Sequence, residues 1–110
     1  MRRVMVRYRV KPERVPEHEA LIRAVYDELG RTKPAGLRYA AFRLEDGVSF
    51  VHLAETEDGG SPLSEVAAFR DFQAGIDERL DEGPVVSALE EIGSFRLFGD
   101  EPIAAAEAPG

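Results

Sequence analysis

His52 is the residue whose type and position best suit chemistry. It lies in VSFVHLAETEDG, residues 48–59, an otherwise apolar run that ends in an acidic turn. Burial lowers the pKa of imidazole from about 6.5, so a buried histidine stays neutral near pH 7 and could act as a base or hydrogen-bond donor. The alternative is a structural histidine, bonded to a tyrosine or arginine or packed in a dimer interface. The structural role is favoured because no orienting carboxylate stands at a fixed spacing, yet His52 remains the best candidate catalytic residue.

Three aromatic residues are the candidate ligand contacts. Tyr8 and Tyr39 could direct a phenolic or carbonyl oxygen by hydrogen bonding, and Phe50 could line an apolar cleft. Tyr26 could join them from a helix. The alternative is structural here too, because tyrosines more often fill the edge of a core with the hydroxyl reaching water.

Other reaction classes find little support. His18 stands beside Glu17 and Glu19, but HEAL lacks the second histidine four residues on that a zinc helix needs, so we expect no metal site. The chain has no cysteine, which excludes thiolate ligands, disulfides and a cysteine nucleophile. No serine lies in a nucleophile elbow and no glycine run has phosphate-loop spacing.

The composition is that of one acidic domain. The chain has 110 residues, with 14 basic and 21 acidic side chains. This length suits a single core, which we expect over residues 1–98, with 99–110 as a flexible tail. The negative field would repel a phosphate backbone and anionic lipid, so we expect neither nucleic acid nor a membrane as a partner. The lack of cysteines and of a signal-peptide pattern favours a cytoplasmic protein.

Hydrophobic periodicity and turn residues predict six main elements. They are a strand over 4–10, a helix stopped by Gly30, strands over 37–44 and 48–55 joined by an Asp46-Gly47 hairpin turn, a helix from Pro62 to about residue 80 with a kink near Gly75, and a strand over 92–98. Gly83-Pro84 is expected to end the second helix, and residues 85–91 to form a short helical turn.

This order, βαββαβ, is the split βαβ pattern of ferredoxin-like α+β folds. Right-handed crossovers would make the first and third strands central in a four-stranded antiparallel sheet, with both helices on one face. The opposite face should still carry apolar side chains, because Val51 and Leu53 point away from Phe50 and His52. We therefore expect a sheet-to-sheet homodimer. The alternative is that single apolar side chains on a surface need no partner.

Four segments together resemble one superfamily. They are the first strand running into VKPE, the YAAFRLEDG to FVHLAET hairpin, the AFRDFQAGI helix and the closing GSFRLF. Over about residues 3–98 the chain resembles the antibiotic biosynthesis monooxygenase-like proteins of the dimeric α+β barrel superfamily. The resemblance implies two four-stranded sheets closing into a barrel, with a ligand cleft between sheet and helices in each subunit. We expect no cofactor.

The same resemblance disfavours two activities of the superfamily. Haem degraders use an asparagine on the first strand, a tryptophan near the end of the third and a histidine on the second helix. Here Val6 lies near the asparagine position, the chain has no tryptophan, and the second helix has no histidine. Cofactor-independent monooxygenases commonly use asparagine, tryptophan or tyrosine near an oxidisable phenol, and this chain has no asparagine.

Three hypotheses for function remain. The first is a dimeric protein that binds a small apolar or aromatic ligand between sheet and helices. The second is a cofactor-independent monooxygenase in which His52 and a tyrosine handle protons, and the third is a purely structural or interaction dimer. A closed apolar core around His52, with both ring nitrogens satisfied, would argue against the oxygenase.

Overall fold

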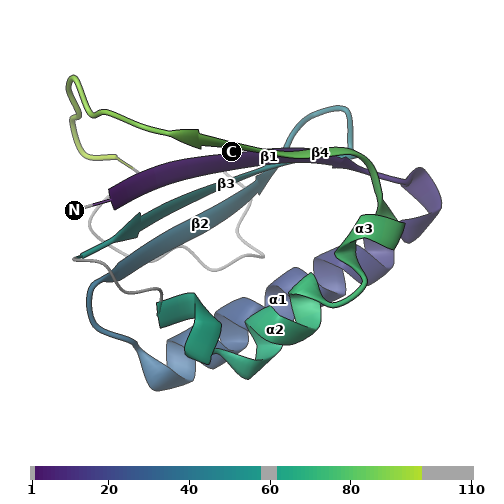
Figure 1. The fold of residues 1–110 in the computed structure, drawn as a ribbon, viewed down its shortest axis with the longest axis horizontal. Coiled ribbons are helices and arrows are strands. Elements are labelled where there is room, and N and C mark those ends of the chain that lie inside the picture. The colour runs from purple at the N-terminus through teal and green to yellow at the C-terminus, as the bar shows by residue number, and fades with distance from the viewer. Residues whose placement is uncertain (1, 58–61, 98–110) are drawn as a thin grey trace.

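Two layers make up the fold, a four-stranded antiparallel sheet and a layer of helices that covers one of its faces (Figure 1). The computed structural model describes residues 2–57 and 62–97. Its elements are β1 (Arg2–Val10), α1 (Val15–Thr32), β2 (Leu37–Arg43), β3 (Ser49–Thr56), α2 (Ala67–Gln73), α3 (Ile76–Arg79) and β4 (Leu80–Ala88), with short 3-10 segments at Pro12–Arg14 and Pro62–Glu65. The expected tail over 99–110 lies outside the described residues.

The strand order is β2-β3-β1-β4, so the prediction that the first and third strands are central is confirmed. β1 pairs antiparallel with both β3 and β4, and β2 pairs antiparallel with β3. In this register Tyr8 stands opposite Phe50 and Val6 opposite His52. These side chains share the face that the helices cover, because alternate residues of a strand point to the same side.

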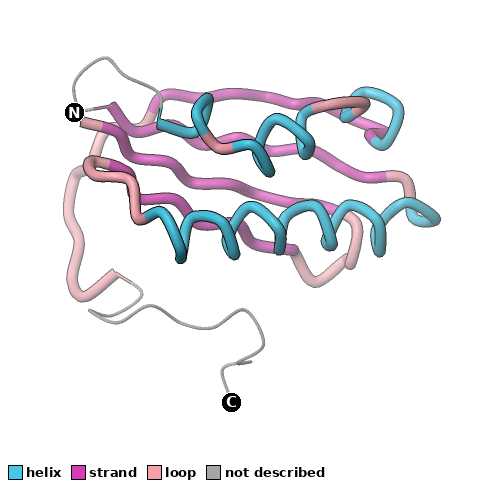
Figure 2. Tube along the Cα trace, turned by 90° about the horizontal axis from the view of Figure 1, so that it is seen from below, coloured by secondary structure: helices cyan, strands magenta, loops and turns pink. Residues whose placement is uncertain are grey.

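Helix α1 lies along the sheet, with α2 and α3 beside it (Figure 2). Pro16 lies in its first turn, as the sequence predicts. The predicted stop at Gly30 is wrong: the helix continues to Thr32, and Lys33 takes the left-handed conformation at φ 45° while its N–H donates to the Leu29 carbonyl at 2.8 Å. A lysine can end a helix here because the bond to that carbonyl satisfies a group the helix leaves unpaired.

The largest differences between the predicted and the observed elements lie in the last third of the chain. The second helix is shorter than expected: α2 and α3 are separated by Gly75 at φ 70°, which confirms the kink, and β4 already starts at Leu80. Gly83-Pro84 therefore lies within a strand instead of ending a helix. β4 pairs only with β1, and an edge strand tolerates a proline because its open side needs no N–H.

Two further expectations fail with this shift. Residues 85–88 belong to β4, so the helical turn over 85–91 is absent, and residues 92–97 form no strand. Ile92 and Phe95 are largely exposed, at 98% and 82%. The closing run IGSFRLF alternates like a strand, but β4 already occupies the edge beside β1. Phe98 lies outside the described residues.

The core lies between the two layers. Its most buried apolar members are Tyr8, Val10, Val25, Phe50, Phe72 and Leu80. A carboxylate ties the two helices together: Glu28 of α1 accepts hydrogen bonds from the Ala67 and Ala68 N–H groups at 3.1 and 2.9 Å. These are among the N–H groups that the first turn of α2 leaves unpaired.

Candidate functional site

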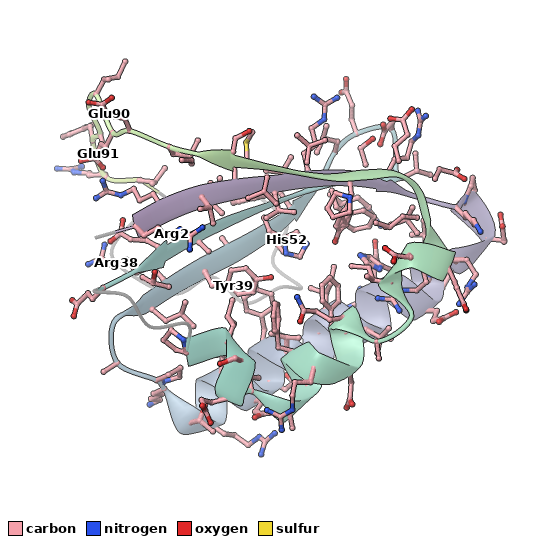
Figure 3. The ribbon with its side chains drawn as sticks, in the orientation of Figure 1. Arg2, Arg38, Tyr39, His52, Glu90 and Glu91 are labelled. Carbon is pink, nitrogen blue, oxygen red and sulfur yellow. The ribbon has the colours of Figure 1, made fainter. Side chains whose placement is uncertain are left out.

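A chain of hydrogen bonds crosses the core beneath the sheet. Four elements contribute its rings: β1 supplies Tyr8, α1 His18, β2 Tyr39 and β3 His52. Figure 3 shows Tyr39 and His52 projecting from the sheet into the space above the helices. His18 is fully buried, His52 is 5% exposed and Tyr8 is 3% exposed. The pairing register brings Tyr8 and His52 onto neighbouring strands, and α1 carries His18 underneath them.

Three short contacts join these rings. The Tyr8 hydroxyl lies 2.6 Å from His18 Nε2 and 2.6 Å from His52 Nε2, so one hydroxyl bridges both histidines. His52 Nδ1 lies 2.6 Å from the Tyr39 hydroxyl. Both ring nitrogens of His52 are therefore occupied by tyrosine hydroxyls.

Arg79 closes one end of the chain. Its Nε–H donates to His18 Nδ1 at 3.2 Å, and its two other nitrogens donate to the carbonyls of Ala74, at 3.1 Å, and Phe72. The guanidinium carbon also lies 5.6 Å from the centre of the Phe72 ring. Arg79 is only 2% exposed, so this cation is held in the core by carbonyls, a histidine and an aromatic ring.

Tyr39 forms the other end, among aromatic rings. Its ring stacks on Tyr26 of α1 with centroids 5.5 Å apart and meets Phe69 of α2 edge-on at 6.3 Å. The Tyr26 hydroxyl is buried and has no hydrogen-bond partner among the described residues. The Tyr39 hydroxyl forms a hydrogen bond with His52 and with no other described residue. Two hydroxyls thus retain unused hydrogen-bonding capacity where α1, α2 and β2 meet.

Burial keeps every ring of this chain neutral. It lowers the pKa of both histidines to about 4, with the charge of Arg79 adding to the effect at His18. It also raises the pKa values of Tyr8, Tyr26 and Tyr39 far above the ordinary value for tyrosine. At pH 7 the site can offer hydrogen bonds, but it holds no imidazolium and no phenolate.

The structure brings together all four site residues that the sequence singles out. His52, Tyr8 and Tyr39 are directly bonded, and Phe50 stacks on Tyr8 with centroids 5.6 Å apart. His52 has the tyrosine partners that the structural interpretation requires. Phe50 is 2% exposed and also meets His18 at 5.0 Å, so it supports the chain from within the core.

Sequence reasoning missed the roles of two residues. The neighbours of His18 in the sequence suggest only an unlikely metal ligand, but His18 falls on the same helical stripe as Leu21, Ile22 and Val25, and this periodicity is the signal for a place in the core. The sequence around Arg79 does not indicate a buried residue, because the pattern IDER is typical of an exposed helical turn. No group of three or more potential ligands among residues 2–57 and 62–97 could hold a metal ion. Within the same ranges, no helix has the length and apolar character needed to cross a membrane.

Comparison with known proteins gives structural neighbours only. No protein-family model and no curated protein sequence matches the chain. A crystal structure of an antibiotic biosynthesis monooxygenase has a TM-score of 0.64 and 20% identity, over 84% of this chain and 100% of that one. A conserved protein from Methanosarcina mazei Go1 has a TM-score of 0.65 and 23% identity, over 82% and 91%. A protein of unknown function from Nitrosomonas europaea has a TM-score of 0.64 and 13% identity, over 86% and 91%.

At these identities the likeness concerns the fold and not the chemistry. The strand order, the helices on one face and the coverage of 91–100% of the neighbouring chains all agree with the resemblance seen in the sequence. The chain therefore has the ferredoxin-like α+β fold of the antibiotic biosynthesis monooxygenase-like proteins.

Proposed function

We propose that this protein binds a small aromatic ligand between the sheet and the helices, beside Tyr39 and Tyr26. The observation that carries this proposal is the pair of hydroxyls with unused hydrogen-bonding capacity inside an aromatic cluster. Buried polar groups are nearly always hydrogen-bonded, so an unpaired hydroxyl calls for a partner. Phe69 and the tyrosine rings offer apolar contact, and the hydroxyls could orient a polar atom of the ligand.

In this arrangement only Tyr39 and Tyr26 would touch the ligand with polar atoms. Tyr8 and His52 would act through Tyr39, because their own polar atoms are used inside the chain of bonds. Phe50 would hold Tyr8 in place by stacking. His52 is thus proposed as a positioning residue, not as a group that meets the ligand.

The test is a nuclear magnetic resonance titration of the 15N-labelled protein with 1-naphthol and, separately, with hexadecanoic acid. We expect 1-naphthol to shift the amide signals of Tyr26, Tyr39 and Phe69, and the fatty acid to leave them unchanged. Phe95, which is 82% exposed and outside the proposed site, provides the control signal. No shift at millimolar 1-naphthol, or equal shifts at Phe95 and Tyr39, would contradict the proposal.

A second candidate function is cofactor-independent oxygenation of an aromatic ligand at the same site. The observation that favours it is the fold shared with a protein described as an antibiotic biosynthesis monooxygenase. The surroundings of His52 argue against it, as expected from the sequence: the ring is 5% exposed and both of its nitrogens are bonded to tyrosine hydroxyls. His52 therefore has no free nitrogen with which to take a proton from a substrate, and Tyr39 would have to mediate any transfer. Oxygen uptake with 1-naphthol that requires the protein and is lost in Tyr39→Phe would support oxygenation. Binding without uptake would leave the ligand-binding function alone.

We also propose that two copies pair through the sheet face that the helices leave open. Its apolar side chains include Met5, Ala40, Val51, Leu53 and Val85. A hollow of about 370 Å³ on this face is lined by Arg7, Arg9, Asp46 and Glu82 among others, and Arg9 already pairs with Glu82 within the chain. Apolar side chains on such a face can pack across a two-fold axis, since each copy presents the same surface.

Val85 and Val86 provide a matched pair of substitutions for the dimer. They are 61% and 59% exposed, and they point to opposite faces of β4. Val85→Lys adds a cation near Arg7 on the open face and should yield monomers in sedimentation at micromolar concentration, whereas Val86→Lys should not. A monomeric wild-type protein would contradict the dimer without affecting the ligand site.

A further inference from the structure

Arg79 is the least expected member of the core. A buried guanidinium is ordinarily compensated by a carboxylate, because removing a charge from water is unfavourable. Among the described residues no carboxylate forms an ion pair with Arg79, and its donors go to two carbonyls and to His18. Burial lowers its pKa, yet arginine remains protonated at any physiological pH. The charge of Glu17 acts on Arg79 without forming an ion pair with it, and the bond to His18 is the contact of Arg79 that bears on the hydrogen-bond chain.

The bond from Arg79 to His18 determines which atom carries each hydrogen in the hydrogen-bond chain. The Nε of a guanidinium can only donate, so His18 Nδ1 must be the acceptor. A neutral imidazole carries one hydrogen, which places the hydrogen of His18 on Nε2. That N–H then donates to the Tyr8 oxygen.

The same assignment of hydrogens continues from Tyr8 to Tyr39, at the other end of the hydrogen-bond chain. The Tyr8 hydroxyl has one hydrogen, and within reach it has one acceptor left, Nε2 of His52. His52 must then carry its own hydrogen on Nδ1, and it donates that hydrogen to the Tyr39 oxygen. The Tyr39 hydroxyl hydrogen is left over and has no acceptor among the described residues.

The opposite direction of the hydrogen bonds, with each histidine in its other tautomer, is unfavourable at both histidines. If His52 carried its hydrogen on Nε2, two N–H groups would point at the Tyr8 oxygen and the buried Tyr8 hydrogen would have no acceptor. If His18 carried its hydrogen on Nδ1, that hydrogen would face the Nε–H of Arg79. Each arrangement leaves a buried donor unpaired, which is unfavourable.

We propose that Arg79 is a positioning residue that sets the direction of the hydrogen-bond chain, so that Tyr39 presents a hydroxyl hydrogen and the site selects aromatic compounds bearing a carbonyl oxygen. This selectivity rests on the ligand site proposed above, whereas the direction of the chain does not. The hydrogen is presented for bonding only, and no proton leaves Tyr39.

The direction of the chain can be measured without any ligand. The protein has two histidines, so long-range 1H–15N spectra at pH 7 report both imidazoles, and His18→Leu assigns them. We expect the hydrogen on Nε2 of His18 and on Nδ1 of His52, two different tautomers in one protein. The same tautomer at both residues, or a protonated imidazole at either one, would overturn the inference.

Substitution of Arg79 separates direction from mere packing. In Arg79→Met the Nε–H is lost, so His18 Nδ1 is no longer forced to accept and the His52 signals should show a mixture of tautomers. His52 signals that keep the pure Nδ1–H tautomer in folded Arg79→Met would contradict the role of Arg79. If this variant does not fold, the wild-type tautomers still decide whether the direction is correct.

The selectivity is tested with 9-fluorenone and fluorene, which have similar shapes and differ in a carbonyl oxygen. A neutral hydrogen bond corresponds to about a fivefold change in affinity, so the ratio of the two affinities should fall about fivefold in Tyr39→Phe. Phe69→Leu, which alters only the apolar contact, should weaken both probes and preserve the ratio. An unchanged ratio in Tyr39→Phe would overturn the selectivity. Binding of neither probe would contradict the proposed function and leave the tautomer result standing.

Discussion

Acidification should destabilise this protein well above the pH at which carboxylates titrate. The pKa values of His18 and His52 are about 4 in the folded protein and about 6.5 in an unfolded chain. Between these values the unfolded chain binds more protons, so the free energy of unfolding falls as pH falls from about 6.5 to about 4. Linkage gives a loss of about 2 kcal/mol per histidine from pH 7 to pH 5, or about 4 kcal/mol for both. The free energy of unfolding of a domain of this size is roughly 5–15 kcal/mol.

Urea unfolding followed by circular dichroism at half-unit steps between pH 7 and pH 5 measures this loss. His52→Phe is the matched variant, since it keeps a flat ring beside Phe72, 5.7 Å away in the native protein, and removes one titrating group. It should lose about half as much stability over the same range. A free energy of unfolding that stays constant from pH 7 to pH 5 would show that the histidines are not neutral and buried as described.

Three further predictions concern single contacts. Tyr8→Phe leaves a donor on one histidine and an acceptor on the other unpaired, so urea unfolding should show a loss of about 2–5 kcal/mol, whereas Tyr39→Phe, which leaves one group unpaired, should lose about half of that. Gly83→Ala places a Cβ 2.8 Å from a backbone oxygen at φ 88° and should lower the melting temperature more than Gly47→Ala, which has φ 79° but open space around it. Glu28→Ala should speed hydrogen exchange of the first amides of α2, and exchange rates equal to wild type would show that the carboxylate does not cap that helix.

Local patterns predicted the first two thirds of the fold well. The strand over 4–10 and the Asp46-Gly47 hairpin depend on alternation and turn chemistry, which nearby residues determine. The kink at Gly75, in the last third, depends in the same way on a local positive φ. The last strand was misplaced because two segments compete for one sheet edge. DEGPVV contains a glycine and a proline that oppose strand formation, whereas IGSFRLF alternates; pairing with β1 decides in favour of the first. Such pairing is set by tertiary structure, not by local propensity.

The site divides in the same way. His52, Tyr8 and Tyr39 could be placed on one face from alternation and strand order alone, and the structure brings them within hydrogen-bonding distance. The partnership with Arg79 could not be predicted, because it joins α1 to α3 across 61 positions of the sequence and depends on where α2 ends. A buried arginine whose partners are backbone carbonyls does not alter the spacing of apolar residues in the sequence, so that spacing cannot reveal it.

An apolar core could occupy the same space without these polar groups. Replacing a buried charged network by apolar side chains of similar volume is often neutral or stabilising, so stability alone does not explain why Arg79, His18 and His52 lie in the core. What the network adds is a direction: each bond passes its polarity to the next, and the result is a hydroxyl hydrogen presented at Tyr39. Protonation of His52 would add a hydrogen on Nε2, which removes the bond from Tyr8, but the Nδ1–H would still donate to Tyr39 and the Tyr39 hydrogen would stay presented. Because the pKa of His52 is about 4 in the folded protein, the preference for 9-fluorenone over fluorene should persist from pH 7 to pH 5, while the free energy of unfolding falls. A preference that is lost in folded protein over this range would contradict the proposed direction.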